Sequence, residues 1–237
     1  MPPIVDIRHA GDRGLTTTEW LQSRHSFSFG DYYDPANTHH GLLLVNNDDI
    51  VKPASGFDTH PHRDMEIVTW VLDGELAHRD SMGNSGVIYP GLAQRMSAGS
   101  GVSHSEKNGS SAAPVHFVQM WVLPDEAGVT PGYQQQEIEL TSSLTPIASG
   151  ATDAAVTLHN RNATLHGARL QAGDTVDLPQ APYVHLFVTR GAVTLEDSGE
   201  LTTGDAARLT ASGGQRVSAS TDAEILVWEM HAGLGGS

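Results

Sequence analysis

The sequence predicts an all-β protein built from two similar barrels, one after the other along the chain. Its 237 residues include 25 glycines and 12 prolines, which suits many short strands joined by tight turns. Apolar stretches of strand length, such as residues 115–123, recur along it. The second half also repeats the first, because residues 183–191 parallel 66–74 and residues 203–211 parallel 90–98. We interpret this internal repeat as a duplicated barrel.

The composition limits both the compartment and the possible ligands. With 13 basic against 28 acidic residues, the net charge is −15, which disfavours phosphate backbones and therefore direct nucleic-acid binding. The chain has no cysteine, so histidine and carboxylate side chains would have to hold a metal ion. The first residues lack the pattern of a signal peptide, and no apolar run approaches the roughly 20 residues that span a bilayer. We expect a cytoplasmic monomer without membrane contact.

The first fifty residues should begin with a strand at 4–7 and a single helical turn at 16–22. In the following segment Phe27 and Phe29 alternate like strand residues with one buried face. Aromatic rings here fit the core, while one or two could line a pocket and stack on a flat ligand. A buried strand is expected at 42–50. Histidines without a partner on a neighbouring strand are expected at the surface: His25, His39 and His40.

A hairpin follows, with strands at 67–72 and 86–89 on either side of a turn-rich segment. These strands can lie side by side in one sheet or barrel. His78 and Asp80 stand at the far end of the hairpin and are expected to face solvent. Further on, Gln119 lies among the apolar residues of a strong strand. It is either a satisfied core amide or a polar group turned toward the cavity.

Two short pairs of polar residues carry the chemistry. Side chains at positions i and i+2 of a strand point to the same face, so His60 and His62 would project together from one strand. His104 and Glu106 would do so from another. The first pair alone would be compatible with ordinary solvated or capping residues, but three imidazoles and one carboxylate aimed inward make a site for a divalent first-row metal. Glu106 would serve as the fourth ligand or as a base beside the metal.

A second carboxylate competes with Glu106 for the metal. Glu66 has the same parity as His60 and His62, so an unbroken strand would also direct it inward. Its alternative role is a hydrogen bond or ion pair with Arg63 or Arg79 at the barrel rim.

The second barrel lacks these ligands. When the internal repeat is extended outward, Asp177 and Pro179 stand at the positions of the first histidine pair, while Val217 and Ala219 stand at those of the second pair. One barrel would then carry the metal site, and the other would remain as scaffold. The predicted domains are an N-terminal barrel over residues 1–130, a linker region over 131–155 and a C-terminal barrel over 156–237.

Four motifs resemble the pirin family, a branch of the cupins. The likeness is closest to bacterial members described as quercetin 2,3-dioxygenases, with dense matches from about residue 5 to Pro131 and only an architectural likeness beyond. The resemblance implies a bicupin, which is two tandem double-stranded β-helix (jelly-roll) barrels. The motifs that carry it lie at residues 25–35, 60–66, 80–84 and 96–106.

The resemblance also implies an activity. A flavonol would bind through its 3-hydroxyl, Glu106 would take that proton, and reaction with dioxygen would open the central ring with release of carbon monoxide. His60, His62 and His104 would hold the metal, for which iron is the expected choice and zinc, manganese, cobalt, nickel and copper are alternatives. Side chains expected to grip the flat rings are Phe27, Phe29, Phe57, Met96 and Trp121.

Two other functions remain open at this point. Eukaryotic pirins suggest a metal- or redox-sensing regulatory protein, which at this net charge would act through a protein partner rather than on DNA. A purely structural metal site is the weaker alternative, because structural zinc normally closes its coordination with cysteine or histidine.

Overall fold

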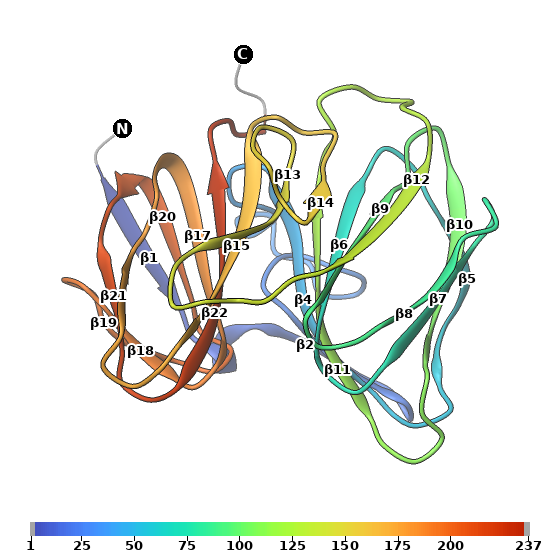
Figure 1. The fold of residues 1–237 in the computed structure, drawn as a ribbon, viewed down its shortest axis with the longest axis horizontal. Coiled ribbons are helices and arrows are strands. Elements are labelled where there is room, and N and C mark those ends of the chain that lie inside the picture. The colour runs from blue at the N-terminus through green and yellow to red at the C-terminus, as the bar shows by residue number, and fades with distance from the viewer. Residues whose placement is uncertain (1–2, 235–237) are drawn as a thin grey trace.

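The computed structural model describes residues 3–234 and contains two β-barrels side by side, which confirms the predicted all-β bicupin architecture (Figure 1). Each barrel pairs a seven-stranded sheet with a four-stranded sheet. The first barrel comprises β2 (Gly14–Thr17), β3 (Leu21–His25), β4 (Leu43–Val51), β5 (Gly56–His62), β6 (Glu66–Asp73), β7 (Leu76–Asp80), β8 (Ser85–Ile88), β9 (Leu92–Ser97), β10 (Val102–Asn108), β11 (Val115–Val122) and β12 (Gly132–Glu137). The second comprises β1 (Ile4–Arg8), β13 (Thr145–Ser149), β14 (Val156–Thr157), β15 (Ala163–Leu170), β16 (Thr175–Asp177), β17 (Gln180–Arg190), β18 (Ala192–Leu195), β19 (Gly199–Thr202), β20 (Ala206–Gly213), β21 (Arg216–Ala219) and β22 (Ala223–Met230).

The two barrels share one strand order. The small sheets run β5-β10-β7-β8 and β16-β21-β18-β19, and the large sheets run β12-β9-β6-β11-β4-β3-β2 and β1-β20-β17-β22-β15-β13-β14. The segments that are parallel in sequence therefore occupy equivalent places: β6 matches β17, and β9 matches β20. This equivalence explains the internal repeat in the sequence.

The outermost strands come from outside the repeated cores. β12 pairs with β9 in the first barrel, whereas β1, from the very start of the chain, pairs with β20 in the second. The short 3₁₀ helix Ala10–Asp12 then leads back to the first barrel. Position along the chain therefore does not by itself assign these two strands to a barrel. The predicted division at residues 131–155 stays a prediction, and residues 1–2 and 235–237 of its outer domains lie outside the described residues.

The helical turn predicted at residues 16–22 is wrong. Thr16 and Thr17 end β2, and Leu21 begins β3, which runs antiparallel to it. The side-chain oxygen of Thr18 accepts hydrogen bonds from the backbone N–H groups of Trp20 and Leu21 and so holds the tight turn between them. β-branched threonines favour strands over helices, and here they outweigh the capping signal.

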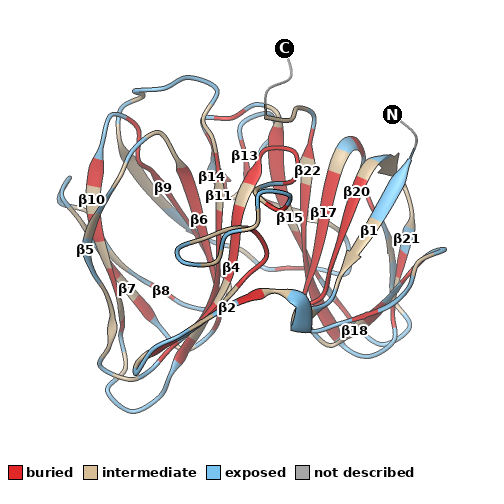
Figure 2. Ribbon diagram, turned by 180° about the vertical axis from the view of Figure 1, so that it is seen from behind, coloured by how far each residue is buried: buried red, intermediate tan, exposed pale blue. Residues whose placement is uncertain are grey.

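The two large sheets pack against each other and share a core. Figure 2 shows that strands β4, β6, β17 and β22 are largely buried. One apolar cluster joins Trp70 and Met120 of the first barrel to Phe187 and Trp228 of the second. Burial of such large rings is the main stabilising contribution at this junction. Within residues 3–234, no helix has the length and apolar composition that crossing a bilayer requires.

A buried arginine of the second barrel holds a loop of the first. The guanidinium of Arg208 lies 4.3 Å from the ring centre of Phe27. It donates hydrogen bonds of 2.7 Å to Asn37 Oδ1 and 2.6 Å to the carbonyl of Ser26. Burial lowers the pKa of Arg208 to about 10. The loop between β3 and β4 is thus fixed by a side chain almost two hundred positions away in sequence.

Replacing this arginine should destabilise the protein. Arg208→Ala would leave buried Asn37 Oδ1 without its donor and the Ser26 carbonyl with only the Asn37 amide, so we expect the free energy of unfolding to fall by about 2 to 4 kcal/mol. Urea denaturation would measure this change. As a control, Arg216→Ala removes an exposed partner of Asp177 and should change stability by less than about 0.5 kcal/mol. Equal effects of the two variants would contradict the role of Arg208.

Candidate metal centre

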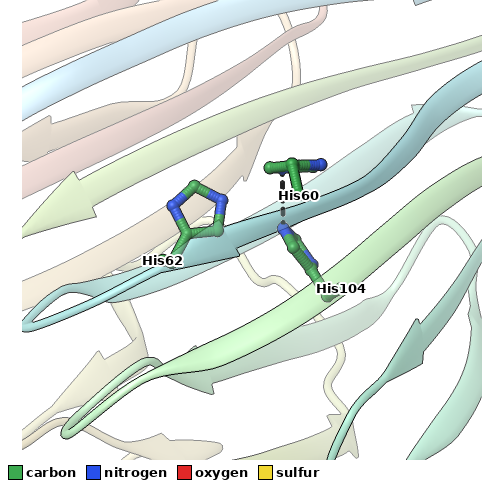
Figure 3. A group of neighbouring side chains, drawn as sticks. All are labelled: His60, His62 and His104. Carbon is green, nitrogen blue, oxygen red and sulfur yellow. Dashed lines mark hydrogen bonds between the residues drawn. The ribbon is translucent and has the colours of Figure 1, made fainter.

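The two predicted donor pairs meet on neighbouring strands of the first barrel. β5 and β10 run antiparallel, and their register places His104 opposite His60. The ring centres of His60, His62 and His104 lie 4.5 to 4.9 Å from one another. Figure 3 shows the three imidazoles clustered above these strands. The register shifts between His104 and Glu106, and this β-bulge adjusts the direction of the second pair.

In His60 and His104, the hydrogen bond made by Nδ1 determines whether Nε2, the nitrogen that faces the other ring, carries a proton. His60 Nδ1 lies 2.7 Å from the carbonyl oxygen of Asp58, which can only accept, so Nδ1 carries the proton. His104 Nδ1 lies 3.4 Å from His78 Nδ1, and His78 Nε2 lies 3.3 Å from Asp80 Oδ2. With Asp80 ionised, this chain places a proton on His104 Nδ1. The Nε2 lone pairs of His60 and His104 then face each other.

The donor set fits a metal ion. The two facing Nε2 atoms are 3.1 Å apart, and two nitrogen ligands at roughly 2.1 Å from one ion would be separated by about 3.0 to 3.4 Å. The Nε2 of His62 is buried without a hydrogen-bond partner, which is unfavourable unless something binds it. One ring nitrogen from each of the three residues lies within 4.8 Å of the others.

The imidazoles are held neutral, which is the form that binds a metal. Burial lowers the pKa of His62 to about 4, with a further contribution from nearby His60. Burial, followed by the neighbouring imidazoles His60, His62 and His78, lowers the pKa of His104 to about 2. Near pH 7 neither ring would need to release a proton before coordinating a cation.

Glu106 lies beside His104, at the edge of the three-histidine cluster, and is 2% exposed. Gln119 Nε2 donates to both of its carboxylate oxygens at 2.9 Å, and Gln119 Oε1 accepts from Trp121 Nε1 at 3.1 Å. Burial raises the pKa of Glu106 to about 7, although the Gln119 hydrogen bond acts in the opposite direction. Glu106 also forms a second close group with His78 and His104. Gln119 therefore faces the site, which agrees with the second of its two predicted roles, a polar group turned toward the cavity.

Glu66 lies outside the metal site, and neither role predicted for it is found. The strand breaks after His62, at Asp64, whose φ of +50° reverses the chain. Glu66 is instead buried behind the site, where it accepts hydrogen bonds from the Ser97 hydroxyl and from the backbone N–H of His159 in the second barrel. The parity argument failed because the two segments do not form one strand.

Three histidines expected at the surface are buried. His78 is 1% exposed and stacks on Tyr133 with ring centres 4.7 Å apart. His25 lines the cavity described below, and His40 lies in the junction between the barrels, where its Nε2 faces the carbonyls of Val184 and Leu209. Of the three histidines without strand-paired partners, His39 alone is exposed as expected. These positions depend on pairing between distant strands, which local sequence does not reveal.

A cavity of about 310 Å³ opens onto His60, His62 and Glu106. Phe29, Phe57 and Trp121 line it, and Trp121 lies edge-on to Phe29 and to His62, at 5.5 and 4.9 Å between ring centres. A larger cleft of about 840 Å³ lies elsewhere, between the barrels. Its arginines are already paired with Glu224 and Asp73, so we place the chemistry in the smaller cavity.

The structure does not bring Phe27 and Met96 to this cavity. Phe27 is buried against Arg208, and Met96 packs with Ile67 and Val102 in a separate apolar cluster. Of the five side chains predicted to contact a flat ligand, three line the cavity and could contact a ligand in it: Phe29, Phe57 and Trp121.

A polar network forms the remaining wall. Ser23 and His25 of β3 lie directly opposite Asp49 and Asn47 of β4. The Ser23 hydroxyl donates to Asp49 Oδ1, and His25 Nδ1 lies 2.9 Å from Asn47 Oδ1. Burial raises the pKa of Asp49 to about 7, with smaller contributions from the charges of Asp48 and Glu106. Nothing in the sequence analysis singled out this network.

The equivalent place in the second barrel is apolar. Asp177 ends β16, and Val217 and Ala219 lie on β21, the strands equivalent to β5 and β10. Val217 and Ala219 are buried in the barrel core. Among residues 3–234, the groups that could hold a metal ion lie in the first barrel.

Comparison with known proteins identifies relatives along the whole chain. A family model described as Pirin matches residues 8–122, and one described as Quercetinase C-terminal cupin domain matches residues 147–230. A Mycobacterium tuberculosis protein named "putative quercetin 2,3-dioxygenase" is 65% identical over 242 residues, covering 100% of this chain and 99% of the relative. An Escherichia coli protein named quercetin 2,3-dioxygenase is 35% identical over 229 residues, covering 96% and 99%.

Solved structures extend the comparison to the fold. The crystal structure of YhhW from Escherichia coli matches with a TM-score of 0.91 at 35% identity, covering 97% of this chain and 98% of that one. The crystal structure of the bacterial pirin YhhW in complex with nickel(II) matches with a TM-score of 0.90 at 34% identity, covering 97% and 100%.

The position of His78 predicts a role in holding the metal. His78→Leu would remove the group that orients His104, so we expect metal affinity to fall about 10- to 100-fold. Competition with a chromogenic chelator would measure this affinity. The exposed neighbour Arg79 provides the matched control, because Arg79→Leu changes the same strand without touching the site. A His78→Leu protein with wild-type affinity would exclude the orienting role.

The buried Asp49 predicts a pH-dependent stability. Its pKa is about 7 in the folded protein and 3.8 in a solvated side chain, so the folded state binds its proton more tightly. The stabilisation is complete below about pH 4 and is lost as the pH rises toward 7, at about 1.4 kcal/mol per pH unit. Urea unfolding at several pH values should show a fall in stability that is steeper in wild-type protein than in Asp49→Asn by up to about 1.4 kcal/mol per pH unit, because Glu106, whose pKa burial also raises to about 7, contributes equally to both proteins. Parallel curves for the two proteins would refute the assignment.

Proposed function

The chain belongs to the pirin family, and from that membership we propose that it is a metal-dependent dioxygenase that cleaves flavonols such as quercetin with release of carbon monoxide. The observation that carries the proposal is the pair of facing imidazole lone pairs of His60 and His104 next to an aromatic-walled cavity, which His60, His62 and the buried carboxyl group of Glu106 line. Relatives named quercetin 2,3-dioxygenase support the substrate class.

His60, His62 and His104 would hold the metal, with Glu106 as the fourth ligand or as a base beside it. A bound divalent ion would supply Lewis acidity and a position for an anionic oxygen. Histidine and carboxylate ligands suit iron, the expected metal, and also zinc, manganese, cobalt, nickel or copper. The nickel(II) complex of the Escherichia coli pirin supports a divalent ion in this family without selecting one for this chain.

Glu106 would take the proton of the flavonol 3-hydroxyl. A general base acts best when its pKa lies near the working pH, and burial raises the pKa of Glu106 to about 7. Gln119 holds both carboxylate oxygens in place and is itself held by Trp121. The base is therefore fixed in direction before a substrate arrives.

The aromatic walls would orient the flat rings. Phe29, Phe57 and Trp121 offer ring edges and faces to a planar ligand, and a cavity of about 310 Å³ is at the lower end of the range for small-molecule pockets. An enclosed apolar wall would also keep water from the reacting oxygen.

Reconstitution tests the activity directly. Metal-free protein would be loaded anaerobically with iron(II), or in parallel with each alternative ion, and then given quercetin in air. We expect loss of quercetin and release of carbon monoxide. His62→Ala should lose bound metal and activity together, and Glu106→Gln should lower kcat by about 10²- to 10⁴-fold.

The control for these variants is His39→Ala, an exposed histidine that belongs neither to the donor groups nor to the cavity lining. It should retain metal and activity. No consumption of quercetin with any of the six ions would remove the dioxygenase proposal.

A further inference from the structure

One wall of the cavity is more polar than an aromatic ligand alone would require. Two cross-strand pairs, Ser23 with Asp49 and His25 with Asn47, point inward from β3 and β4. Thr16 of β2 adds a hydroxyl 2.9 Å from His25 Nε2. Polar groups are costly to bury, so their presence on the inner face of a barrel needs a reason.

Most of these groups satisfy one another, but two atoms do not. Asp49 Oδ1 is bound by Ser23, and Asn47 Oδ1 is bound by His25. Asp49 Oδ2 and Asn47 Nδ2 have no hydrogen-bond partner in residues 3–234. Both atoms also remain partly accessible, since neither belongs to the fully buried atoms that lack a partner. Both residues line the cavity, so these two atoms are open to a ligand within it.

The Ser23 hydrogen bond occupies only one of the two carboxyl oxygens of Asp49. With the Ser23 hydroxyl donating to Oδ1, a proton on neutral Asp49 is carried by Oδ2. Burial raises the pKa of this carboxyl group to about 7, so both forms exist near neutral pH. Asp49 can then donate to a ligand oxygen or accept from a ligand hydroxyl.

The strand register separates Asp49 from the row that contains Gln119. Along β11, Trp121 touches His62, Gln119 holds Glu106, and Phe117 pairs with Asp49. Asn47 pairs with Gln119 in the register, and two residues along a strand cover roughly 7 Å, so Asp49 lies roughly 7 Å beyond the row of Asn47 and Gln119. An oxygen bound there belongs to a ring other than the reacting one.

We propose that Asp49 and Asn47, with Ser23 behind them, form a second oxygen-binding site that recognises a remote hydroxyl group of the substrate. This inference rests on the proposed function and narrows its substrate class to flat aromatic compounds with oxygen functions at both ends. The metal donors and Glu106 receive the reacting hydroxyl, while Asp49, with Asn47 between it and that end of the cavity, sets the position of the far ring.

Binding of two flavonols tests the second site. Quercetin carries ring hydroxyls that 3-hydroxyflavone lacks, although both have the 3-hydroxyl. Dissociation constants would be measured without dioxygen, from quenching of tryptophan fluorescence, on protein with the metal that it carries on purification. Asp49→Leu should weaken quercetin binding about tenfold or more. It should change 3-hydroxyflavone binding by less than about threefold, which also shows that the variant is folded.

Asp49→Asn is the matched variant. Its amide has nearly the same shape and can still hydrogen-bond an oxygen, so quercetin binding should stay within about threefold of wild type. Equal effects of Asp49→Leu on both flavonols, or no effect on either, would overturn the second site while leaving the proposed function intact. Wild-type protein that binds neither flavonol would overturn the proposed function and this site with it.

Discussion

The approach of two imidazole nitrogens to 3.1 Å, with lone pairs facing each other, is the interaction on which the site depends. Two lone pairs at this separation repel unless a cation lies between them. The backbone carbonyl of Asp58 fixes one ring and the chain from Asp80 through His78 fixes the other. Neither ring can relieve the repulsion by changing tautomer without losing its hydrogen bond. The barrel is therefore organised for a positive charge at this point.

The second barrel supports this arrangement although it carries no ligand of its own. At the equivalent strand positions, the side chains of Val217 and Ala219 are buried in the apolar core. The interior of the second barrel is therefore filled at this point. Arg208 donates hydrogen bonds to the loop between β3 and β4, which contains the cavity-lining Phe29. His159 donates its backbone N–H to Glu66 at the start of β6. These contacts let the second barrel help to position the first.

Sequence reasoning found the parts of the site that depend on local geometry. The period of two along a strand identified His60 with His62 and His104 with Glu106, and the internal repeat identified the duplicated barrel. His78 was missed because its role depends on β7 pairing with β10, an arrangement that no short segment encodes. The rule that alternate residues share a face also fails where a strand ends. Glu66 illustrates this, because β5 ends at His62 and Glu66 begins the next strand. The polar wall at Asp49 shows the same limit, since Ser23 becomes its partner only through the register of β3 and β4.

The charge state of the cavity explains how so acidic a protein can tolerate two enclosed carboxyl groups. Burial raises the pKa of both Glu106 and Asp49 to about 7, while it keeps the imidazoles of His62 and His104 neutral. Near neutral pH the interior therefore carries little net charge, and the desolvation cost stays low. A divalent cation held here would change this balance, because it favours ionised oxygen ligands. Metal binding would then be coupled to the removal of protons from neighbouring oxygens, and the nearly neutral cavity would become able to receive an anionic oxygen.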